Sequence, residues 1–96
     1  MGQVTTLISL VEGLGSLDQE ATIYAAEPWT SASRAIVARE PDSGGLPAEA
    51  QSRGLKYFLE VAIACDFLNG WATSLGHDPS NQERCDRLIQ YAVNDA

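Results

Sequence analysis

The stretch LKYFLEVAIACDFLNGWATSL, residues 55–75, is the most strongly patterned part of the chain. Apolar side chains recur in it at alternating steps of four and three, the spacing of one face of an α-helix. They are Tyr57, Val61, Ala64, Leu68, Trp71 and Leu75. Further apolar residues widen this face, so the pattern predicts one long central helix over residues 55–75, packed on more than one side. Gly76 is expected to end it in a left-handed conformation.

Helices are also expected at both ends of the chain. Apolar residues at helical spacing predict an N-terminal helix over residues 3–13; they are Val4, Leu7, Ile8 and Val11. Near the other end, Ser80 and Glu83 form the S-x-x-E pattern of a capping box. Asp78 followed by Pro79 gives a competing start for the same C-terminal helix.

Two short segments between these helices are predicted to be strands. Residues 21–26 and 35–39 carry β-branched or aromatic side chains, and Pro41 ends the second segment. They predict a two-stranded antiparallel ribbon. Residues 40–47 are rich in proline and glycine and are expected to form a loop, followed by a short helical turn over residues 47–52. Because an isolated ribbon is marginally stable in water, it must pack on the helices or pair with another copy.

The predicted order is therefore N-terminal helix, two-stranded ribbon, long central helix and C-terminal helix. This is an α+β fold, expected to form a single domain over residues 1–96 because so short a chain cannot divide into two well-buried cores. No apolar run approaches the roughly 18 residues of a membrane-spanning helix. The start of the chain lacks the pattern of a secretory signal. We therefore expect a cytoplasmic protein that does not bind membranes.

The charge balance of the chain favours some partners over others. Thirteen acidic residues against six basic ones give a net charge of −7. The basic residues are scattered along the sequence, whereas nucleic-acid binding depends on clustered Lys and Arg. Direct nucleic-acid binding is thus disfavoured. Long-range attraction favours a protein partner with a basic surface, although the charge also serves solubility alone.

The chain offers few residues for metal or thiol chemistry. It has one histidine, His77, and two cysteines, Cys65 and Cys85, without a Cys-x-x-Cys pair. No metal or cofactor is expected, because a structural metal site needs three or four ligands. Cys85 near the start of the last helix, with His77 upstream, is the candidate pair for a cysteine-dependent enzyme. The alternative, which we favour, is that both thiols are apolar filler in a reducing compartment.

The candidate partner-binding surface combines an aromatic residue with negative charge. We expect it to consist of the 27–33 loop and the 40–46 loop; its residues are Glu27, Trp29, Glu40 and Asp42. A loop tryptophan is a common hot spot of protein interfaces. The alternative, that Trp29 is tucked under the ribbon as a plug, is favoured by the cost of exposing a tryptophan. The binding hypothesis predicts that Trp29→Ala with Glu40→Lys abolishes partner capture at a nearly unchanged melting temperature.

Two segments carry a resemblance to other proteins. Residues 21–29 (ATIYAAEPW) and 57–61 (YFLEV) resemble small bacterial proteins of uncharacterised function, some of which are similar to immunity partners of secreted toxins. The resemblance implies a small, cytoplasmic, acidic binder. We therefore expect a non-catalytic protein-binding module, of inhibitor or immunity type. The alternatives are the cysteine-dependent enzyme and a homodimeric accessory subunit of a larger assembly.

Overall fold

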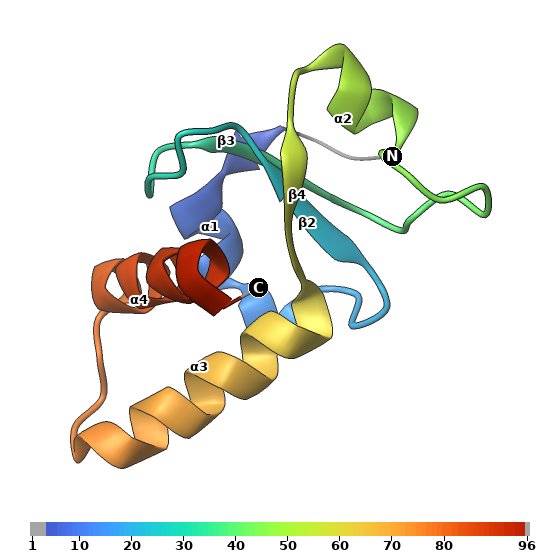
Figure 1. The fold of residues 1–96 in the computed structure, drawn as a ribbon. Helices are drawn as coiled ribbons and strands as arrows, with labels where there is room; N and C mark the ends of the chain where they lie inside the picture. The colour runs from blue at the N-terminus through green and yellow to red at the C-terminus, as the bar shows by residue number, and fades with distance from the viewer. Residues whose placement is uncertain (1–3, 96) are drawn as a thin grey trace.

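The computed structural model describes residues 4–95 (Figure 1). It has an α+β fold, as the sequence predicts. Its strands are β1 (Thr5–Thr6), β2 (Thr22–Ala25), β3 (Arg34–Ala38) and β4 (Lys56–Glu60). Its helices are α1 (Leu7–Glu12), the short 3-10 helix η1 (Leu14–Ser16), α2 (Ala48–Ser52), α3 (Val61–Leu75) and α4 (Asn81–Asp95).

The strands form a single antiparallel sheet in the order β1-β3-β2-β4. The predicted antiparallel pair is confirmed as β2 and β3, with Ile23 opposite Val37 and Tyr24 opposite Ile36. The predicted limit of two strands is wrong, because β1 pairs with the free side of β3 and β4 with the free side of β2. The ribbon therefore gains its neighbours from the same chain.

The predicted central helix over residues 55–75 is also wrong in its first part. Residues 56–60 form β4, and α3 begins only at Val61. A bulge lies in β4 opposite Ile23 and Tyr24 of β2, and it lets two consecutive residues, Phe58 and Leu59, both enter the core. Pairing with β2 and burial of these two side chains outweigh the local helical spacing. Neither contribution is visible in residues 55–75 alone.

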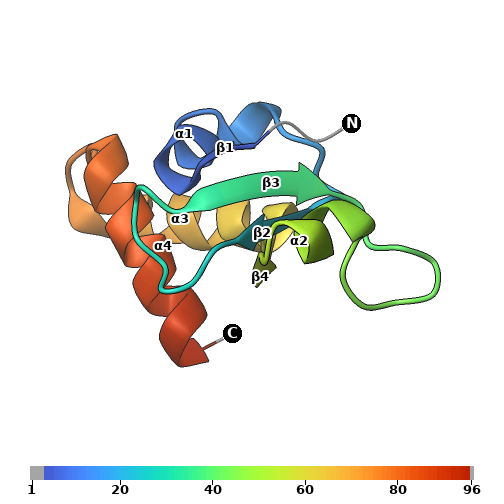
Figure 2. The ribbon, with the colours of Figure 1, turned by 90° about the horizontal axis from the view of Figure 1, so that it is seen from above.

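The main core lies on one face of the sheet, under α1, α3 and α4 (Figure 2). Its fully buried side chains come from all of these elements, as in Leu7 of α1, Val61 of α3 and Leu88 of α4. Burial of a large apolar side chain contributes about 1.5–3 kcal/mol before chain entropy is subtracted. The three helices thus fix this face of the sheet firmly.

The opposite face carries a smaller core under α2, made of Tyr24, Ile36, Ala50 and Leu55. The end of α2 is fixed by two hydrogen bonds from the following residues: Gly54 N donates to Gln51 O at 3.2 Å and Leu55 N to Ala50 O at 2.9 Å. Gly54 has a φ of 69°, so this is a Schellman motif, in which Leu55 packs back on Ala50. The motif directs the chain from α2 into β4.

Most of the predicted helix ends are confirmed. Ser80 Oγ accepts from Glu83 N at 3.1 Å and the Glu83 carboxylate accepts from Ser80 N at 2.8 Å, which confirms the capping box. Gly76 ends α3 with a φ of 77°, as expected. The N-terminal helix is shorter than the predicted residues 3–13, since α1 covers only Leu7–Glu12. Gln3, where the predicted helix begins, lies outside the described residues. Thr6 belongs to β1 and caps α1 by accepting from Ser9 N at 3.3 Å.

Candidate functional site

The two loops of the predicted partner surface lie far apart. Residues 26–33 precede β3 and residues 39–47 follow it, so the loops lie at opposite ends of this strand (Figure 2). A strand of five residues spans roughly 16 Å. The structure therefore does not bring Glu27 and Trp29 together with Glu40 and Asp42 into one surface. The three carboxylates are exposed, and their role in binding stays a prediction.

Trp29 packs inward against the main core instead of projecting from its loop. Its indole ring meets the Phe58 ring edge-on, with centroids 4.8 Å apart and an interplanar angle of 87°. Its Nε1 donates to the carbonyl oxygen of Ala25 at 3.2 Å. The side chain is half-buried. Of the two interpretations that the sequence allows, the structure supports the plug that closes the core beneath the β2–β3 connection.

The exposed aromatic residue is Tyr57, which the sequence pattern places inside a helix. It belongs to the edge strand β4 and is 42% exposed. Its ring rests edge-on against the buried Tyr24 ring, with centroids 6.4 Å apart. In Figure 1 no other element lies in front of β4, and Figure 2 also places it at the outer side of the sheet. Tyr57 is therefore held in a defined orientation at an accessible edge.

Two carboxylates act on the phenol of Tyr57. Burial of part of the ring raises its pKa most, and the negative charges of Glu60 and Glu40 raise the pKa further. Burial likewise raises the pKa of Tyr24, and Glu40 adds to that shift. We call Tyr57, Glu40 and Glu60 the acidic tyrosine surface. It retains Glu40 from the predicted surface and replaces Trp29 by Tyr57 as the exposed aromatic group.

No protein family, curated protein or solved structure matches this chain. Within residues 4–95, no helix combines the length and apolar character needed to cross a membrane. The same residues contain no group of three or more His, Cys, Asp or Glu side chains placed to hold a metal ion. The function must therefore be argued from the geometry of the site.

The proposed catalytic pair lacks the geometry of an activated thiol. Cys85 is fully buried in the main core, and this burial, with a smaller effect of Asp86, raises its pKa to about 11. A catalytic cysteine requires the opposite shift, because the thiolate is the nucleophile. His77 is exposed in the connection between α3 and α4. Cys85 therefore fills core volume, as the favoured interpretation of the sequence holds.

The raised pKa of Cys85 makes stability depend on pH. An unfolded thiol loses its proton near its ordinary pKa of 9.0, whereas the folded one keeps it to about 11. The native state thus binds more protons between these values, and the free energy of unfolding falls as the pH rises through this window. We expect a loss of about 1–2 kcal/mol in urea denaturation. Cys85→Ala should lose less, because it removes the group whose pKa is raised to about 11; an equal loss in both proteins would contradict the assignment.

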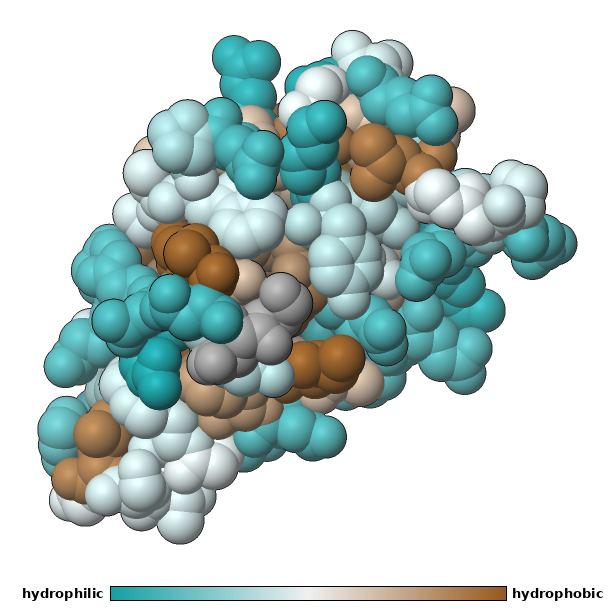
Figure 3. Space-filling model, viewed as in Figure 1, coloured by the Kyte–Doolittle hydropathy of each residue, from teal (hydrophilic) through white to brown (hydrophobic). Residues whose placement is uncertain are grey.

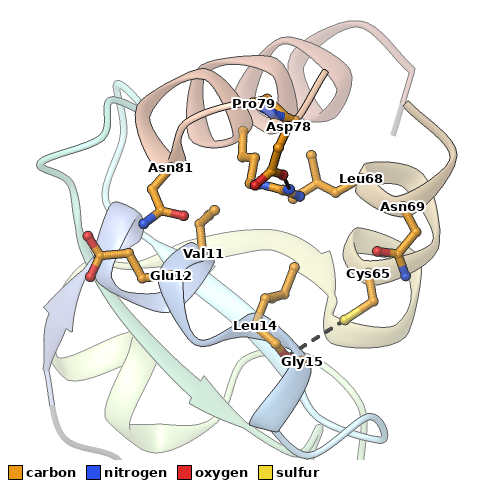
Figure 4. Close-up of a pocket in the computed structure, with 11 residues that line it drawn as sticks. Val11, Glu12, Leu14, Gly15, Cys65, Leu68, Asn69, Asp78, Pro79 and Asn81 are labelled. Carbon is orange, nitrogen blue, oxygen red and sulfur yellow. Dashed lines mark hydrogen bonds and ion pairs between the residues drawn. The ribbon is translucent and has the colours of Figure 1, made fainter. Parts of the chain in front are cut away.

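A hollow of about 350 Å³ lies between the end of α1, η1, α3 and the start of α4 (Figure 4). Arg84 lines it and pairs with the Asp78 carboxylate at 2.8 Å. Cys65 lies in its wall and donates from Sγ to Leu14 O at 3.7 Å. Glu12 adds a second negative charge. The thiol here meets a backbone carbonyl and no imidazole, and the arginine charge is already matched, so the hollow contains no assembled catalytic group.

Proposed function

We propose that this protein is a non-catalytic, acidic protein-binding module that captures a partner with a basic surface. An inhibitor of the immunity type is the form that the sequence resemblance favours. The observation that carries the proposal is Tyr57, which is 42% exposed on the edge strand and whose phenol lies in the negative field of Glu60 and Glu40. Tyrosine and arginine are enriched among the residues that dominate binding energy. A partner arginine here would stack on the ring and pair with a carboxylate.

The chemistry of β4 favours docking through side chains over addition of a further strand. Edge strands attract other strands through their unpaired backbone groups. In β4, charged Lys56 and Glu60 lie at the two ends and a bulge interrupts the strand between them. These features are known to oppose edge-to-edge pairing. Figure 3 supports a polar contact, because apolar side chains on this face form small separate patches.

A distinct basic partner is also favoured over a second copy of this chain. Self-association through the acidic tyrosine surface would bring Glu40 and Glu60 of both copies together, and like charges in an interface cost affinity. The whole chain carries a charge of −7, which opposes self-association further. The homodimer therefore remains the alternative that the binding experiment tests beside the main proposal.

The test is quantitative capture of partners by a tagged protein in the cells that produce it. Tyr57→Ala and Glu60→Lys are expected to lower recovery of the same basic protein by about tenfold or more, the cost of losing a hot-spot side chain. Glu12→Lys makes the same charge change at an exposed position of α1 and serves as the matched control. Melting temperatures verify that all variants fold. Equal recovery by all four proteins would refute the proposal, and recovery of only a second copy would establish the homodimer.

A further inference from the structure

A second hollow, of about 320 Å³, lies on the face of the sheet that carries α2. Its lining joins three parts of the chain: the first described residue, the start of β3 and the end of α2 with the residues after it. The lining residues are Val4, Arg34, Ser52, Arg53 and Leu55. Among these described residues, Arg34 and Arg53 are exposed and Val4 is half-buried, so the hollow combines positive charge with an apolar contact. Leu55 is 1% exposed and belongs to the smaller core.

These two arginines differ from the other described arginines in their contacts. Across residues 4–95, the other arginines contact an acidic or aromatic side chain; they are Arg39, Arg84 and Arg87. Arg34 and Arg53 form no ion pair within that part of the chain, although acidic residues outnumber basic ones by thirteen to six. Two like charges around one hollow repel each other, and a bound anion would relieve that repulsion.

The backbone beneath both arginines is fixed. Arg34 begins β3, pairs with Thr6 of β1, and its carbonyl accepts from Ala26 N at 2.9 Å. Arg53 occupies the cap position of α2, where the Schellman motif described above holds the chain. Ser52 Oγ already donates to Glu49 O at 3.1 Å. The guanidinium groups are therefore the donors that the hollow offers to a ligand.

We propose that this hollow binds a carboxylate joined to a short aliphatic group. A guanidinium group matches a carboxylate with two parallel hydrogen bonds. The half-buried side chain of Val4 supplies the apolar contact for the attached group, since Leu55 is only 1% exposed. Either a free short-chain acid or the C-terminal carboxylate of a polypeptide ending in an aliphatic residue has this chemistry. None of the described lining residues belongs to the acidic tyrosine surface, and the proposal does not depend on the proposed protein-binding function.

The test is titration of the ¹⁵N-labelled protein with butyrate, acetate and butylammonium at constant ionic strength. Butyrate should shift the amide signals of Arg34, Arg53 and Leu55 saturably, and bind about tenfold more tightly than acetate because of its two extra methylene groups. Butylammonium should cause no such shift. A short peptide ending in valine is tested with a free and with an amidated C-terminus. Tighter binding of the free peptide than of butyrate identifies a polypeptide end as the source, and the reverse order identifies a free acid.

Variants separate this site from general charge effects. Arg34→Ala and Arg53→Ala are each expected to weaken butyrate binding by about tenfold or more, since each removes a charged hydrogen-bond donor. Arg34→Lys keeps the positive charge but loses the paired donors of the guanidinium group, so it should weaken butyrate binding less than Arg34→Ala does. Lys56→Ala removes an exposed cation outside the hollow and is the control. Absence of saturation with every probe, equal binding of butylammonium, or equal losses in Lys56→Ala would overturn the proposal.

Discussion

Cys85 in the folded protein is expected to react with iodoacetamide at least about 100-fold more slowly at pH 7.5 than in the unfolded chain. The reason is the shift of its pKa from 9.0 to about 11, which lowers the thiolate fraction by that factor. Complete burial of the residue adds a steric barrier. The measurement is mass-spectrometric alkylation kinetics of a Cys65→Ser protein, in which Cys85 is the only thiol, with and without denaturant.

The matched control is Cys85→Ser, which leaves half-buried Cys65 as the reporter and should react faster in the folded state. Slow reaction of Cys85 removes the cysteine-dependent enzyme from consideration. A fast reaction of Cys85 whose rate is lowered by the substitution His77→Ala would support that enzyme instead, because an imidazole would then be activating the thiol. The experiment thus tests the cysteine-dependent enzyme without knowledge of any partner.

Trp29→Ala is expected to lower the free energy of unfolding by about 2–3 kcal/mol. The substitution removes the edge-on contact with Phe58 at 4.8 Å and the hydrogen bond to Ala25 O. The loss of unfolding free energy would be larger if the Trp29 side chain were fully buried, but this side chain is only half-buried. For a domain of this size the change corresponds to a drop in melting temperature of about 10 °C or more. Urea denaturation and thermal unfolding followed by circular dichroism measure both quantities.

The control for Trp29 is Glu27→Ala, an exposed substitution in the same loop that should change stability by no more than about 0.5 kcal/mol. A double-mutant cycle with Phe58→Leu should give a coupling of about 0.5–1.5 kcal/mol for the aromatic pair. An unchanged melting temperature for Trp29→Ala would mean that the indole does not close the core. The other interpretation that the sequence allows, an exposed interface anchor, would then be supported.

Trp29 and Tyr57 show why the exposure of an aromatic side chain is difficult to predict from the sequence. Trp29 follows Pro28 in a long connection, where the sequence allows either an exposed anchor or a plug, and the structure packs its ring against Phe58. Tyr57 fits an apolar helical stripe, yet it is 42% exposed. The choice depends on which neighbours cover each ring. Those neighbours come from distant parts of the chain, so spacing within a window does not reveal them.

Local signals in the sequence determined several elements of this protein. The capping box at Ser80 and Glu83, the left-handed end at Gly76 and the β-branched segments of β2 and β3 all formed as expected. Each depends on hydrogen bonds or conformational preferences within a few residues. The same is true of α3 from Val61 onward, whose apolar spacing continues over fifteen residues.

Only the tertiary structure decided where the central pattern divides. Residues 56–60 satisfy a helical spacing, but the free edge of β2 offers them backbone hydrogen bonds, and a bulge lets Phe58 and Leu59 both enter the core. The separation of the 27–33 and 40–46 loops and the placement of Arg34 and Arg53 around one hollow were likewise not predictable from the sequence. Contacts between segments far apart along the chain depend on how all the helices and strands pack together. The spacing of apolar residues within one segment therefore does not predict them.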